Sequence, residues 1–136
     1  MVYFAGMSEE NVERLRAVYA EWAKGNFDVG REIFATEFAF EPQTPDERAT
    51  LGRDDVEGHM REFLAQWREF RIEAEEFADF GEAVLVTERQ HGIGKSSGVE
   101  TDQTFYSVWT FRNGLVVRVR WDTSRASALG AAGLSE

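Results

Sequence analysis

The feature that most restricts the fold is a β-hairpin pattern in the last third of the chain. Residues 105–111 and 115–122 are two strand-like runs, rich in aromatic and β-branched side chains, on either side of Arg112-Asn113-Gly114. An Asn-Gly pair between two such runs is a strong signal for a tight hairpin turn. These residues therefore predict two long antiparallel strands at the end of a sheet.

Two registers of this hairpin are compatible with the turn. A two-residue turn pairs Arg112 with Leu115 and mixes bulky aromatic residues with charged ones on one face. A three-residue turn, with Gly114 as a left-handed bulge residue, keeps the two kinds of residue apart. The hydrophobic pattern favours this second register, which pairs Phe111 with Leu115, Trp109 with Val117, Ser107 with Val119 and Phe105 with Trp121.

Ser107 is the one polar residue in the resulting aromatic row. An unpaired hydroxyl in such a place costs about 1–3 kcal/mol. We therefore expect Ser107 either to bond locally or to face a cavity, and the sequence leaves both open.

The rest of the chain alternates helical and strand-like segments. Ser8 is the expected N-cap of a first helix, whose apolar stripe includes Tyr19 and Trp22, and a short helix is expected over 27–34. A middle helix follows Arg53, a small-residue helix spans 124–134, and Glu75-Glu76 suggests a bulge. Strands are expected at 37–41, from 69 onward, and at 82–91, 99–112 and 115–122. The pattern predicts an α+β fold with residues 1–7 as an N-terminal extension and 8–136 as one domain.

Composition excludes several classes of function. The chain has 136 residues, no cysteine and a net charge of −10, which disfavours nucleic acid and anionic membrane surfaces as partners. No apolar run is long enough for a membrane span or a signal peptide, so a cytoplasmic location is expected. His59 and His91 lack the local spacing of metal ligands, and we expect neither a metal nor an organic cofactor.

Several segments in order along the chain resemble the SnoaL-like branch of the nuclear-transport-factor-two-like superfamily, which includes ketosteroid isomerase-like proteins. The matching segments are 19–28, 51–56, 94–98, 108–114 and 128–134. The resemblance implies a strongly curved antiparallel sheet wrapped around about three helices, cone-shaped with one open-ended pocket, and often a homodimer. It also implies that Ser107 occupies an inward position where many relatives carry a histidine or an acid.

Candidate site residues follow from both arguments. Glu41, which precedes Pro42 as an acid does in isomerase-like relatives, and His91 at a strand end are the candidate catalytic residues. A small hydrophobic molecule is the expected partner, and the residues expected to bind it are Tyr19, Trp22, His59, Phe63, Phe105, Ser107, Trp109, Val119 and Trp121. Two functions stay open: a cofactor-independent isomerase, cyclase or hydrolase, and a non-catalytic ligand-binding or dimeric interaction module.

Overall fold

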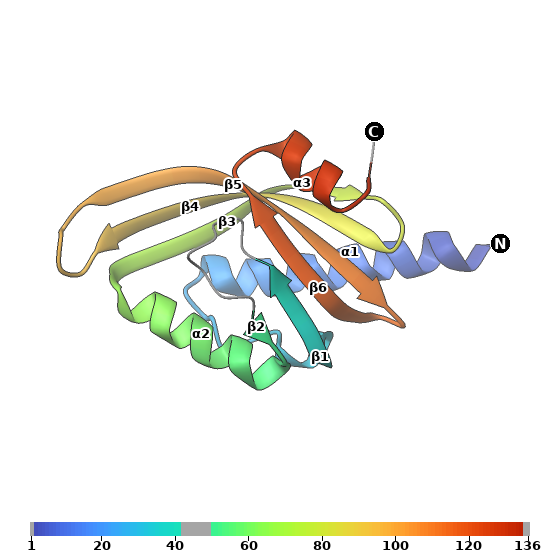
Figure 1. Ribbon diagram of the computed structural model, residues 1–136, viewed down its shortest axis with the longest axis horizontal. Coiled ribbons are helices and arrows are strands. Elements are labelled where there is room, and N and C mark those ends of the chain that lie inside the picture. The colour runs from blue at the N-terminus through green and yellow to red at the C-terminus, as the bar shows by residue number, and fades with distance from the viewer. Residues whose placement is uncertain (1, 42–49, 135–136) are drawn as a thin grey trace.

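The described part of the protein contains three α-helices, one 3-10 turn and six strands, and the strands form one bent sheet (Figure 1). The computed structural model describes residues 2–41 and 50–134, except for the side chains of residues 2–8, 38–41, 50–51 and 54–56. The elements in chain order are α1 (Val2–Ala23), η1 (Arg31–Ile33), β1 (Phe34–Glu41), β2 (Thr50–Leu51), α2 (Arg53–Ala65), β3 (Trp67–Asp79), β4 (Ala83–Gly94), β5 (Glu100–Arg112), β6 (Leu115–Asp122) and α3 (Arg125–Ala131).

The sheet is a meander of β3 to β6 that is extended by the two early strands. Its order is β2-β1-β6-β5-β4-β3, and every neighbouring pair is antiparallel except β1 and β6, which run parallel. The predicted α+β fold is confirmed, but the sheet is mixed rather than wholly antiparallel. The three turns of the meander bring β6 beside β1, and the two strands run in the same direction. The sequences of the individual strands do not reveal this parallel pairing.

Each face of the sheet is covered by a different helix. Val84 and Val86 of β4 belong to the core under α1, which also contains the helix residues Leu15, Tyr19 and Trp22. The alternate residues Ala83 and Leu85 pack with Ala128 and Leu129 of α3 in a second core. Figure 1 shows α1 and α3 on opposite sides of the bent sheet. We call the face under α1 the inner face.

The β5–β6 hairpin has a different register from the one that the hydrophobic pattern favoured. Asn113 and Gly114 have φ angles of 53° and 79°, and they form a two-residue turn that pairs Arg112 with Leu115. The register then shifts after Phe111 and Val116, so that Val117 is an extra residue, Trp109 pairs with Val119, and Ser107 with Trp121. The three-residue turn was wrong because this bulge lets a two-residue turn coexist with an apolar inner face.

Other boundaries also differ from expectation. Helix α1 begins at Val2 and continues through Ser8, so Ser8 is not its N-cap. The expected helix over 27–34 is only the 3-10 turn η1, whereas the bulge near Glu75 is confirmed by a register shift between β3 and β4. No helix in the described part of the chain is long and apolar enough to cross a membrane.

Candidate functional site

A buried carboxyl group lies at the centre of the inner face. Glu88 on β4 is 4% exposed, and it shares its face with Val84 and Val86 because side chains alternate along a strand. Its cross-strand neighbour on β5 is Phe105, and Ser107 lies beside it opposite Val86. The fold therefore places one acid between the apolar rows that line α1.

Three side chains donate hydrogen bonds to this carboxyl group. The Tyr19 hydroxyl from α1 donates to Glu88 Oε2 at 2.5 Å, and the Ser107 hydroxyl donates to the same oxygen at 3.3 Å. Gln90 Nε2 donates to the other oxygen, Oε1, at 3.0 Å. The Trp109 indole nitrogen lies 3.2 Å from the Tyr19 hydroxyl oxygen and 3.1 Å from Ser107 Oγ, and it donates to this pair. We call Tyr19, Glu88, Gln90, Ser107 and Trp109 the inner polar cluster.

Burial controls the electrostatics of the cluster. It raises the pKa of Glu88 because the charged form is poorly solvated, although the bonds from Tyr19, Gln90 and Ser107 oppose this shift. The pKa of Tyr19 is also raised well above its ordinary value, first by burial and then by the neighbouring Glu88 charge. Tyr19 is therefore held as a neutral donor, and Glu88 keeps its proton to a higher pH than an exposed glutamate does.

Aromatic rings surround the cluster on the α1 side. The Tyr19 ring lies 5.1 Å from Trp22, 5.8 Å from Phe77 and 6.0 Å from Trp109, measured between ring centroids. A second group of rings continues from Trp22 through Phe27 to Phe70, Phe63 and Trp67. This wall keeps the local dielectric low, which strengthens each polar interaction inside it.

Exposure rises on the inner face from Glu88 to the pair of Gln90 and Gln103, and it falls again at Gly92, which is buried under Trp67. Glu88 is buried, Gln90 is half-buried, and Gln103, which pairs with Gln90 across the strands, is exposed. Glu88 thus lies at the inner end of a polar row that reaches solvent through Gln90.

The structure brings only part of the expected site together. Tyr19, Ser107 and Trp109 meet in the cluster, with Trp22 against their rings, and Val119 lies beside Trp109 on β6. Phe105 packs edge-on against Trp121 at 5.0 Å, whereas Phe63 packs farther along on Phe70. Of the two expectations for Ser107, local bonding or a position facing a cavity, the structure shows hydrogen bonds within the chain.

Three expected residues do not share this arrangement. His91 lies on the outer face, where its Nδ1 is 3.6 Å from Asp102 Oδ2 and where Arg89 pairs with the same carboxylate. His59 is half-buried on α2, one turn before Phe63. Glu41 ends β1 in register with Arg120, and its side chain lies outside the described residues.

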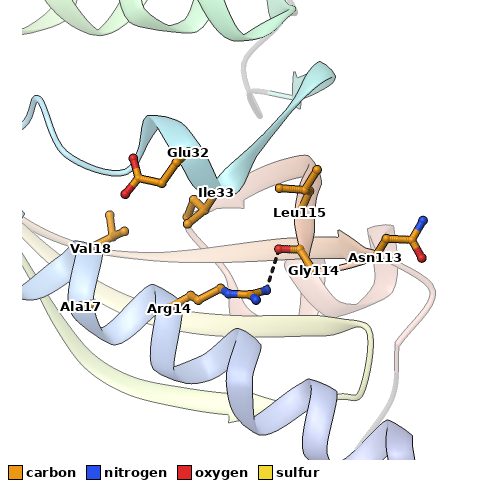
Figure 2. Close-up of a pocket in the computed structure, with 8 residues that line it drawn as sticks. All are labelled: Arg14, Ala17, Val18, Glu32, Ile33, Asn113, Gly114 and Leu115. Carbon is orange, nitrogen blue, oxygen red and sulfur yellow. Dashed lines mark hydrogen bonds between the residues drawn. The ribbon is translucent and has the colours of Figure 1, made fainter.

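A groove of about 400 Å³ lies elsewhere, between α1, η1 and the β5–β6 turn (Figure 2). Arg14 spans it and donates from Nη1 to the Gly114 carbonyl oxygen at 2.7 Å, with Glu32 and Leu115 on its rim. No residue of the inner polar cluster lines this groove. It is therefore a separate feature from the candidate site.

A profile of the SnoaL-like domain family matches residues 4–119. The match contains all five residues of the inner polar cluster, which lie on α1, β4 and β5. This chain belongs to the SnoaL-like domain family. Among curated proteins, no sequence matches it.

Solved structures support the same fold for this SnoaL-like domain. An NTF2-like protein of unknown function from Burkholderia pseudomallei has a TM-score of 0.74 at 20% identity, with 89% of this chain and 95% of that chain covered. A putative SnoaL-like polyketide cyclase from Jannaschia sp. CCS1 also gives 0.74 at 20%, with 94% of each covered. TerC, co-crystallised with polyporic acid, gives 0.71 at 16%, with 87% and 94% covered. The fold is therefore NTF2-like.

Sequence reasoning missed two residues of this SnoaL-like site, Glu88 and Gln90, which lie on the same face of β4. Both faces of β4 are apolar from Ala83 to Val86, so the pattern could not tell which parity points inward. A usable signal was present, because Glu88 is the first charged residue after five uncharged ones and Ser107 needed a polar partner in the same row.

Proposed function

We propose that this SnoaL-like domain binds a small apolar carbonyl compound and polarises its oxygen with Tyr19 and Glu88. The observation that supports this most is the 2.5 Å hydrogen bond between the Tyr19 hydroxyl and Glu88 Oε2 in a buried, aromatic surrounding. A carboxyl group with a raised pKa can hold a proton and donate a hydrogen bond to the Tyr19 hydroxyl oxygen. The phenolic hydrogen is then free for a carbonyl oxygen on which negative charge develops.

The chemistry requires no cofactor. As a proton leaves the carbon next to the carbonyl group, charge grows on the oxygen, and donors fixed in a dry interior bind that charge more strongly than the ground state. Return of the proton to another carbon completes an isomerisation with no change of oxidation state. Glu41 is our hypothesis for the base, and Glu41→Gln should stop proton removal while binding persists.

The test is deuterium exchange into the acetyl group of 4-acetylbiphenyl, followed by NMR in D₂O. The protein should accelerate the exchange, and Tyr19→Phe should reduce the acceleration about 100-fold, as for the loss of one oxyanion donor. Tyr106→Phe is the matched control, because Tyr106 is half-buried on the outer face. Equal rates for wild type and Tyr19→Phe would refute the assignment.

A second candidate is a non-catalytic binding module, and one observation favours it. Both carboxylate oxygens of Glu88 already accept hydrogen bonds from within the chain, so the cluster can be a completed internal network. In that case 4-acetylbiphenyl would raise the melting temperature without any exchange of its protons. A homodimer is proposed for either function, and light scattering at micromolar concentration measures it directly.

A further inference from the structure

The indole of Trp67 lies on the inner face beyond the inner polar cluster. A Cβ atom at Gly92 would lie 2.5 Å from Cε3 and from Cζ3 of Trp67, so the ring lies flat against the β4 backbone at this glycine. Glu88, Gln90 and Gly92 alternate along β4 and therefore share the inner face. The Trp67 ring thus continues the row that begins at Glu88.

A local irregularity in β3 explains how this ring reaches the inner face. The β3–β4 register shifts between Trp67 and Glu69, so that Arg68 is an extra residue in the ladder. Trp67 and Phe70 consequently lie on the same side of the strand, with their ring centroids 5.6 Å apart, and Phe63 of α2 packs 5.9 Å from Trp67. The tryptophan is held by aromatic packing and by the absence of a side chain at Gly92.

The indole N–H of Trp67 has no hydrogen-bond partner in the described part of the chain. Its Nε1 atom is buried and has none among the residues that the structure describes. By contrast, Trp109 Nε1 donates within the cluster and Trp22 Nε1 donates to the Val29 carbonyl oxygen at 3.4 Å. Since buried donors are nearly always satisfied, this N–H is available to a hydrogen-bond acceptor on a bound molecule.

We propose that Trp67 is a second ligand contact, whose indole N–H binds a hydrogen-bond acceptor at the far end of an elongated aromatic carbonyl compound held by Tyr19 and Glu88. The inference rests on the proposed function and specifies its ligand. Four residues of strand separate Glu88 from Gly92, which corresponds to about 13 Å. This distance equals the length of two or three rings in a row, and the half-buried Gln90 lies between the two ends.

The experiment compares two probes and two variants. 4-Acetylbiphenyl carries only the carbonyl group, and 4-acetyl-4′-methoxybiphenyl adds an acceptor at the far end. Trp67→Phe keeps an aromatic ring and removes the N–H. It should weaken the methoxy probe about five- to tenfold, the effect of one neutral hydrogen bond, and leave the affinity for the plain probe nearly unchanged.

The free protein gives an independent readout. Trp67→Phe loses ring volume but no hydrogen bond, so it should lower the melting temperature less than Trp22→Phe does. Trp22→Phe, which removes a bonded N–H, should lower it. If the melting temperature of Trp67→Phe is as low as that of Trp22→Phe, the Trp67 N–H is already bonded without ligand. This result would refute the proposal.

The remaining outcomes separate this proposal from the proposed function. If Tyr19→Phe abolishes binding of both probes but Trp67→Phe weakens neither, the carbonyl site stands and the Trp67 contact is wrong. If neither biphenyl binds the wild-type protein, the elongated ligand class is wrong, and the exchange assay with smaller ketones still tests Tyr19 and Glu88.

Discussion

Replacing Tyr19 with phenylalanine removes the strongest contact of the inner polar cluster without changing the ring. The Tyr19 hydroxyl is buried, donates to Glu88 Oε2 at 2.5 Å and accepts from Trp109 Nε1 at 3.2 Å. A hydrogen bond to a charged group contributes about 1.5–3 kcal/mol, and one to a neutral group about 0.5–1.5 kcal/mol. The loss should therefore depend on whether Glu88 is ionised.

The direction with pH follows from the two forms of Glu88. Loss of the Tyr19 donor raises the folded-state pKa of Glu88 further, because the bond stabilises the charged form. Tyr19→Phe should thus lower the free energy of unfolding by about 2 kcal/mol at pH 8 and by about 1 kcal/mol where Glu88 is protonated. A loss of 2 kcal/mol corresponds to about 7 °C in melting temperature for a domain of this size.

Urea denaturation between pH 5.5 and 8.5 measures both quantities. In a Glu88→Gln background the effect of Tyr19→Phe should become independent of pH, because no charge remains to respond to the missing donor. Tyr106→Phe should change the stability by less than about 0.5 kcal/mol. An equal loss in both backgrounds at every pH would refute the coupling between Tyr19 and Glu88.

Three further predictions concern the same face of the sheet. Glu88→Gln should remove a pH-dependent part of the stability: the folded-state pKa lies above the ordinary value of 4.5, so this stabilisation is complete below pH 4.5 and is lost as pH rises through the folded-state pKa. The free energy of unfolding of the wild type minus that of the variant should fall over this pH range. A difference that stays constant or rises would contradict the burial of Glu88. Ser107→Ala should lower the free energy of unfolding in urea by about 1 kcal/mol, because it removes a donor to Glu88. Ser107→Leu should lower it further through overpacking, and a stabilising leucine would mean that this position faces open space. Gly92→Ala should lower the stability in melting experiments by about 1–3 kcal/mol, because the Trp67 ring cannot move away from the new methyl group. Gly94→Ala should lower it less, since the nearby Ser97 hydroxyl can rotate away. Equal losses of stability would argue against the close packing of Trp67.

The α1 face of the core could be predicted from the sequence because it depends on a single helical period. Leu15, Val18, Tyr19 and Trp22 are all buried, as their spacing indicated. The inward row of β5 was also correct, since Ser107, Trp109 and Phe111 alternate with residues of the other face. These patterns are local, and a short stretch of chain contains the information.

The rest of the site depends on contacts between distant segments. The face of Glu88 is hidden in the sequence because α3 covers the other side of β4 and makes both parities apolar. The bulge at Val117 compensates for the two-residue turn, so hydrophobic alternation alone selected the wrong hairpin register. The packing of the Trp67 ring on Gly92 likewise depends on the bulge at Arg68, and the residue type of Arg68 does not indicate a bulge.

A carboxyl-carbon NMR titration of Glu88 with and without 4-acetylbiphenyl tests most directly whether the buried carboxyl group contacts a bound molecule. We predict that free Glu88 titrates above 4.5 and that the ligand shifts both its resonance and its pKa. Asp102 on the outer face, whose pKa is lowered chiefly by its hydrogen bond with Arg89, should not respond. A Glu88 resonance that titrates at or below 4.5 and is unchanged by the ligand would contradict a buried carboxyl group that contacts the bound molecule.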